Sequence, residues 1–219
     1  MEYLQRTADE HLRERLNAFG AVLIEGPKWC GKTTTAMQQA NSIIKLQDTD
    51  MRAQYLATAA AKPSLLLQGA KPRLIDEWQD APVIWDAVRT MVDERQAEGQ
   101  FILTGSNSVD KTQILHTGNG RITKMQMLPM SLWESKESNG SVSLKELFDN
   151  PNEDIAAISD LDLVDLIKAA CRGGWPAAVC AKGKNAALSV ARDYVNTVCN
   201  SDIMRIDGVR RNSQLTRQI

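Results

Sequence analysis

The sequence predicts an α/β fold: a parallel five-stranded sheet flanked by helices, followed by a small helical region. Short apolar runs alternate with longer segments of helical periodicity, a pattern typical of a parallel sheet that carries helices on both faces. The chain has 219 residues, of which 43% are hydrophobic, enough for one α/β domain and a smaller appendage. We expect the first domain to span residues 1–135 and the helical region to span residues 136–219.

The elements of the first domain follow one another along the chain. Leu12 and Leu16 lie one turn apart in the first helix, and Ile84 and Val88 share one face of a later amphipathic helix. Five apolar segments are expected to form strands, at residues 21–24, 43–46, 73–76, 101–104 and 122–128. Helices are expected at residues 8–18, 34–40, 51–61 and 82–97.

A glycine-rich loop follows the first expected strand. Residues 26–33 read Gly-Pro-Lys-Trp-Cys-Gly-Lys-Thr, which has the two glycines, the lysine and the hydroxyl residue of a Walker A phosphate-binding loop. The strand before it and the helix after it are the context that this motif requires. Glycine permits backbone angles that a Cβ would forbid, so that N–H groups can surround phosphate oxygens. The residues expected to bind a nucleotide are Gly26, Pro27, Lys28, Trp29, Cys30, Gly31, Lys32, Thr33 and Thr34.

Individual loop residues have separate expected roles. Lys32 would contact the β- and γ-phosphates, Thr33 would ligate Mg²⁺, and Thr34 would lie near the α-phosphate. Cys30 is expected to be an accessible thiol whose pKa the positive loop lowers, or else a spectator that points away. Trp29 would stack on a base, cover the phosphates or pack against the sheet. The alternative for the whole segment is a glycine turn with a solvated lysine.

Two adjacent carboxylates end the third expected strand. Asp76 and Glu77 follow the apolar residues Leu74 and Ile75, at the edge of the sheet where α/β proteins bind ligands. Neighbouring strand residues point to opposite sides, so the two carboxylates would serve different purposes. Asp76 would hold Mg²⁺ through water, opposite Thr33, while Glu77 would act as the general base. A solvated acidic turn is the alternative.

Further polar residues are candidates for a γ-phosphate contact. Thr104 and Ser106 end the fourth expected strand and would act as a sensor of the γ-phosphate, unless the segment is only a turn with capping residues. Arg121 stands at the start of the fifth strand. It would act as an arginine finger, in cis or from a neighbouring copy, or would pair with a carboxylate that fixes the strand.

Composition limits the partners. The net charge is −1, so a general affinity for nucleic acid is unsupported, although a basic cluster lies near the chain end at Arg205, Arg210, Arg211 and Arg217. No stretch reaches the eighteen or so apolar residues of a membrane helix, and the N-terminus lacks a signal-peptide pattern. The four cysteines lack metal-binding spacing, which favours reduced thiols and a cytoplasmic location.

The motifs together resemble one known family, the prokaryotic AAA-type (AAA+-like) ATP-binding proteins with a DUF4143 C-terminal region. The segments that carry the resemblance are residues 26–33, 74–79, 103–106, 120–121, 128–134 and 173–176. The resemblance implies a sheet in the strand order 5-1-4-3-2, with a helical or winged-helix region behind it. Together with the lack of an NKxD motif, it favours ATP over GTP. Family members have about twice this length, so we expect a truncated chain.

Three functions fit these features. The favoured one is Mg-dependent ATP binding and hydrolysis that drives an unknown protein partner, and assembly as a homo-oligomer is compatible with it. An ATP-dependent regulator or DNA-associated switch with little turnover is the alternative. A small-molecule kinase is disfavoured because the chain has a water-activating arrangement and no evident arginine-rich lid. The Gly-Gly-Trp-Pro segment at residues 173–176 is expected to be a structural turn.

Overall fold

The computed structural model describes residues 3–105 and 118–198, and the chain divides into two compact units. One unit is Gln5–Leu128, and the other consists of Met1–Leu4 and Pro129–Ile219. The first unit contains the whole sheet, whereas the described part of the second is helical. The domain boundary expected after residue 135 stays a prediction.

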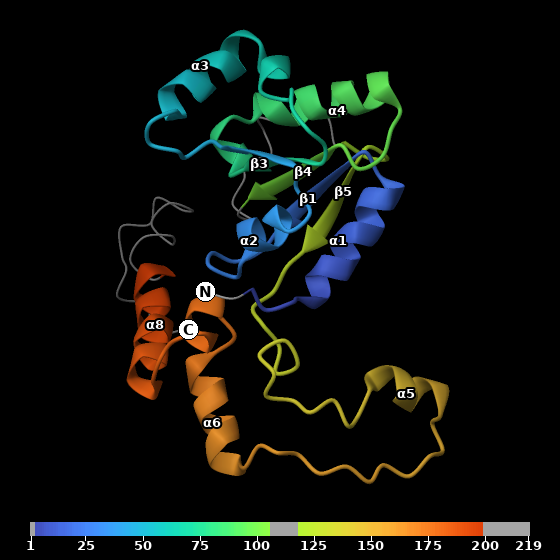
Figure 1. Cartoon of the computed structure of the whole chain (residues 1–219), viewed down its shortest axis with the longest axis vertical. Coiled ribbons are helices and arrows are strands. Elements are labelled where there is room, and N and C mark those ends of the chain that lie inside the picture. The colour runs from blue at the N-terminus through green and yellow to red at the C-terminus, as the bar shows by residue number, and fades with distance from the viewer. Residues whose placement is uncertain (1–2, 106–117, 199–219) are drawn as a thin grey trace, which may run out of the picture. The chain divides into compact units, whose positions relative to one another are not determined.

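The first unit is built on a five-stranded sheet (Figure 1). All the described strand pairs are parallel, and the order is β2-β3-β4-β1-β5. This confirms the expected order 5-1-4-3-2, read from the opposite edge. The strands are β1 (Ala21–Glu25), β2 (Ser42–Lys45), β3 (Arg73–Asp76), β4 (Phe101–Gly105) and β5 (Ile122–Gln126).

Helices cover both faces of the sheet. One face carries α1 (Thr7–Ala18) and the short α2 (Lys32–Met37), which ends earlier than expected. The opposite face carries α3 (Arg52–Ala61) and α4 (Val83–Arg95), as Figure 1 shows. Two short 3-10 helices, η1 (Pro63–Leu65) and η2 (Trp78–Asp80), complete this second layer.

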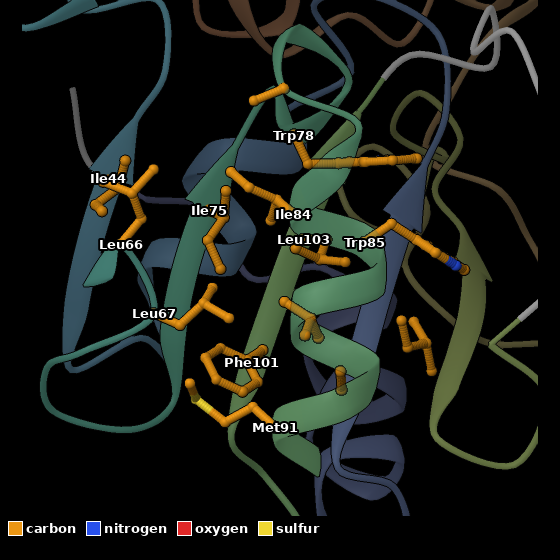
Figure 2. Close-up of a cluster of buried hydrophobic side chains, with 14 of the residues drawn as sticks. Ile44, Leu66, Leu67, Ile75, Trp78, Ile84, Trp85, Met91, Phe101 and Leu103 are labelled. Atoms are coloured by element: carbon orange, nitrogen blue, oxygen red, sulfur yellow. The ribbon is translucent and has the colours of Figure 1, made fainter. Parts of the chain in front are cut away.

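Alternation along the strands creates two hydrophobic cores. In β1, Ala21 and Leu23 face α4, whereas Val22 and Ile24 face the layer of α1 and α2. Such alternation follows from the two-residue period of a strand. Figure 2 shows the core beneath α4, where Trp85 lies near Trp78 with ring centroids 5.0 Å apart. Because both faces are packed, the carboxyl ends of the strands are held in a fixed register.

The second unit contains four described helices: α5 (Leu144–Asp149), α6 (Leu163–Arg172), α7 (Pro176–Val179) and α8 (Lys184–Thr197). Arg172 donates to both carboxylate oxygens of Glu137 at 2.8 and 2.7 Å, and this pairing is the main cause that lowers the pKa of Glu137. The Gly-Gly-Trp-Pro segment joins α6 to α7, so it is the expected structural turn. Within residues 3–105 and 118–198, every helix is too short or too polar to cross a membrane.

Candidate functional site

The glycine-rich loop connects β1 to α2. Gly31 has φ of +100°, in the left-handed region that favours glycine, and it caps α2. The Lys32 side chain folds back over the loop, where Nζ donates to the carbonyl oxygens of Gly26 at 3.0 Å and Pro27 at 2.9 Å. Lys32 is buried by this contact. The loop therefore holds one ammonium group within its own concave side.

Gly26 is needed for a different reason from the one expected. Its φ lies outside the left-handed region, so backbone freedom does not explain the glycine. A Cβ at this position would instead lie 2.2 Å from the carbonyl oxygen of Met127 and 3.3 Å from Cys30 Sγ. The first glycine of the loop allows the chain to pass directly against the segment that leaves β5.

Arg6 is a part of this site that sequence reasoning missed. Its guanidinium is buried and donates from Nη1 to the Cys30 carbonyl at 2.9 Å and from Nη2 to the Leu128 carbonyl at 2.8 Å. Arg6 also precedes α1, where its backbone N–H donates to Asp9 at 2.8 Å. This residue fastens the phosphate loop to the chain that follows β5. The capping pair with Asp9 marks Arg6 as the residue before a helix, but no sequence signal marks its contacts with the two carbonyl groups.

Asp76 is the centre of a hydroxyl cluster at the carboxyl ends of the strands. Its Oδ1 accepts a hydrogen bond from Thr33 at 2.6 Å and another from Thr104 at 2.6 Å. Thr33 belongs to the first turn of α2, and Thr104 lies beside Asp76 in the register of β3 and β4. Three elements distant in sequence thus place their oxygen atoms together. This is the convergence that the motif spacing predicts.

Glu77 lies just beyond the strand, which ends at Asp76. It was expected to point opposite Asp76 by strand alternation, but its backbone has φ of +57° and ψ of +50°, in the left-handed region. The turn into η2 therefore sets its direction. Its backbone N–H approaches the Thr104 hydroxyl at 3.4 Å, and its carboxylate accepts a hydrogen bond from Gln79 Nε2.

A comparison with protein families identifies the domain in which these residues lie. The family model described as "AAA domain" matches residues 18–136, more than half of the chain. The chain belongs to the AAA domain family. The AAA domain includes the whole sheet, the phosphate loop and the Asp76 cluster, which supports nucleotide binding by a P-loop fold. A second model, "Domain of unknown function (DUF8612)", matches residues 163–219, where the sequence resemblance had implied a DUF4143 region.

Curated relatives are similar but uncharacterized. Proteins Mb2031c of Mycobacterium bovis and Rv2008c of Mycobacterium tuberculosis are each 27% identical over 207 residues, which is 94% of this chain. The chain spans 41% of the length of each relative. Among solved structures, the Walker-type ATPase PABY2304 of Pyrococcus abyssi aligns with a TM-score of 0.48 and 12% identity, covering 97% of this chain and 77% of that one. A RuvB mutant of Thermotoga maritima aligns with a TM-score of 0.36 and 15% identity, covering 96% of this chain and 65% of that one.

The structure of the AAA domain corrects the cis role considered for Arg121. Arg121 precedes β5, and its carbonyl accepts from Ala21 N–H at the amino end of β1, so it lies at the sheet edge opposite the phosphate loop. The five residues of β5 alone span roughly 16 Å. Its Nε donates to Asp93 at 2.6 Å, which is the carboxylate pairing expected as the alternative. Arg121 cannot reach a phosphate bound in its own loop.

The remaining loop residues and the sensor candidates differ in their surroundings. Trp29 is 47% exposed and has φ of +63°, so its indole is not buried against the sheet. Pro27 and Lys28 are half-buried, and Thr34 is exposed. Of the two sensor candidates, Thr104 is committed to Asp76, while Ser106 lies outside the described residues.

Cys30 is not the accessible thiol that the loop position suggested. Its side chain is fully buried and its Sγ lies 3.7 Å from the Met127 carbonyl oxygen, to which it donates. Burial raises the pKa of the Cys30 thiol despite the opposing positive charges of Lys32 and Arg6. The thiol faces the core beside β5, so the expected accessibility is wrong and the spectator alternative fits.

Alkylation should therefore distinguish two cysteines. With iodoacetamide at neutral pH, we expect Cys30 to react more than about tenfold more slowly than the exposed Cys171, because it is both buried and protonated. A raised pKa means less thiolate at any given pH, so Cys30 should gain reactivity only above its ordinary value of 9.0. Peptide mass spectrometry measures both rates, and unfolding in urea should equalise them. Equal rates in the folded protein would contradict this placement.

Proposed function

We propose that this chain binds ATP with Mg²⁺ and hydrolyses it. One observation carries the proposal: the Thr33 and Thr104 hydroxyl groups both lie 2.6 Å from one oxygen of Asp76, directly beside the phosphate loop. A loop hydroxyl next to a strand-end carboxylate is the oxygen pair that a P-loop enzyme uses for its metal. Membership of the AAA domain family supports the same site.

The loop would supply the nucleotide contacts. Backbone N–H groups of residues 26–34 would surround the phosphates, with Trp29 over a base or the phosphates and Thr34 near the α-phosphate. Lys32 Nζ, now 3.0 and 2.9 Å from two loop carbonyls, would exchange these for the β- and γ-phosphate oxygens. The exchange favours binding because an anion is a stronger partner for an ammonium group than a carbonyl.

The donors at Asp76 suit Mg²⁺. A hydroxyl and a carboxylate are the hard oxygen ligands that this ion prefers, and Thr33 would ligate it directly while Asp76 holds it through water. Among the described residues, no group of three acidic, histidine or cysteine side chains gathers to hold a metal alone. Phosphate oxygens and water would therefore complete the shell. Bound Mg²⁺ would offset the negative charge of the β- and γ-phosphates.

Glu77 would orient and deprotonate the attacking water as the general base. Thr104 would keep Asp76 in place and sense the γ-phosphate, with Ser106 as a second sensor. Arg121 would act only on the phosphate of a neighbouring copy in a homo-oligomer. We place this reaction in the cytoplasm, where ATP is abundant and thiols are reduced.

ATP hydrolysis by this chain would drive a change in another protein. An unknown protein partner would receive the conformational change. Nucleic acid as that partner has no support from the net charge of −1.

Lys32→Ala tests the proposal. Wild-type protein should release phosphate from ATP in Mg²⁺ and not in EDTA, whereas Lys32→Ala should bind ATP at least about tenfold more weakly because a charged phosphate contact is lost. Calorimetry measures the affinity and a phosphate-release assay the turnover. Lys62→Ala, an exposed lysine after α3, is the matched control and should behave as wild type.

Three outcomes would overturn the proposal in different ways. An unchanged ATP affinity in Lys32→Ala would mean that the loop does not bind the nucleotide. Tight ATP binding by wild type with no phosphate release would favour the ATP-dependent regulator. Phosphate transfer that requires an added acceptor would indicate a kinase.

A further inference from the structure

Within the described part of the chain, the Glu77 carboxylate has a single side-chain partner, Gln79. Gln79 lies two residues later, in η2, and its Nε2 donates to Glu77 Oε2. The backbone of Glu77 is in the left-handed region at φ of +57°, which is uncommon for a residue with a Cβ. A turn of this kind sends the carboxylate back over η2. Backbone geometry and the Gln79 amide together define where the carboxylate points.

The orientation of the Gln79 amide is fixed by charge. Its nitrogen faces the Glu77 carboxylate, and its Oε1 is buried without a hydrogen-bond partner among the described residues. A flipped amide would place its carbonyl oxygen against the carboxylate, and the two acceptors would repel each other. An unsatisfied oxygen is the cost of keeping the donor on Glu77. That cost indicates that the contact with Glu77 determines this side chain.

Gly105 makes room for the amide at the end of β4. A Cβ on Gly105 would lie 2.7 Å from Gln79 Oε1 and 2.9 Å from Trp78 Nε1. Trp78 is 1% exposed and packs beside Trp85 in the core that Figure 2 shows, so the indole cannot retreat. The wall next to Gln79 is therefore rigid. Any side chain at position 105 would displace the amide.

We propose that Gln79 is a positioning residue that orients the Glu77 carboxylate toward the attacking water. The proposal rests on the ATPase function given above and adds a residue to it. Gln79 acts through Glu77 and has no contact with the phosphates. Loss of its donor leaves the carboxylate free to rotate about its side-chain bonds, so that fewer molecules hold it in the reactive direction.

Gln79→Met is the direct test, because methionine keeps the length of the side chain and removes the donor. We expect kcat for ATP to fall roughly ten- to a hundredfold while KM and the Kd for ATP stay within about twofold. Gly105→Ala should lower kcat in the same way by displacing the amide. Gln68→Met is the matched control, since the exposed Gln68 also donates one hydrogen bond, to Ser64.

A double-mutant cycle separates positioning from a structural role. In the Glu77→Gln background, adding Gln79→Met should change kcat little, because the group that it positions is gone. The inference would be overturned if Gln79→Met lowered kcat by the same factor in the wild-type and Glu77→Gln backgrounds, or if kcat were unchanged in Gln79→Met alone. Neither result would contradict the proposed ATPase function. Wild-type protein that never releases phosphate would overturn both.

Discussion

Replacing Glu77 with glutamine is expected to lower kcat for ATP hydrolysis by a factor on the order of 10² to 10⁴ and to preserve ATP affinity. Glutamine keeps the shape of the side chain but cannot accept the proton of the attacking water. Binding should persist because the proposed phosphate contacts come from the loop and the proposed metal ligands are Thr33 and Asp76. Steady-state phosphate release measures kcat, and calorimetry with Mg-ATP measures Kd.

Controls make this result specific to Glu77. Glu14→Gln changes an exposed carboxylate on α1 and should keep the kcat of the wild type. Thermal unfolding of both variants should match the wild type, since Glu77 is only half-buried. If Glu77→Gln hydrolysed ATP at the wild-type rate, another group would be the general base. The positioning role proposed for Gln79 would then also be wrong. If ATP affinity fell with kcat, Glu77 would belong to the binding site instead.

The sheet could be predicted because its signals are local. Apolar runs such as residues 101–104 are too short to show a helical period, and they alternate along the chain with segments of helical periodicity. The order of the strands had no such signal. The expected order came from the family resemblance. The spatial neighbour of a parallel strand depends on how the connecting segments pack against the sheet, which no single segment of sequence reveals.

The phosphate loop, Asp76 and Thr104 were predictable for a related reason. Each lies at the carboxyl end of a strand or directly after it, and parallel strands all end at one edge, so residues at strand ends meet. The same rule could have corrected Arg121. That residue precedes its strand, and therefore lies at the other edge, where Asp93 pairs with it.

Contacts with carbonyl groups had no sequence signal at all. Arg6 binds the carbonyl groups of Cys30 and Leu128, which are 24 and 122 positions away, and every residue carries such a group. The direction of the Cys30 side chain likewise depends on where β5 ends. Gln79 is different, since a donor two residues after a carboxylate is visible in sequence. Only the left-handed turn at Glu77 makes them meet.

Gly26→Ala is expected to be the most disruptive small substitution at the site, costing about 3 kcal/mol in the free energy of unfolding. The new Cβ would lie 2.2 Å from the Met127 carbonyl oxygen. The backbone of Met127 is held in place because its N–H donates to the Glu25 carbonyl oxygen at 2.7 Å. Neither Gly26 nor Met127 can shift without opening the contact between β1 and the end of β5. Urea unfolding followed by tryptophan fluorescence measures the loss.

The same substitution should weaken ATP binding, because relief of the clash moves the loop away from β5 and from the Arg6 guanidinium that holds the Cys30 carbonyl. Gly120→Ala is the comparison. Its Cβ would meet no atom within 4 Å, so only its left-handed φ of +79° carries a penalty, about 1 kcal/mol, with ATP affinity unchanged. A loss of stability in Gly26→Ala no larger than that in Gly120→Ala would mean that the close approach of β5 does not explain why the loop begins with glycine.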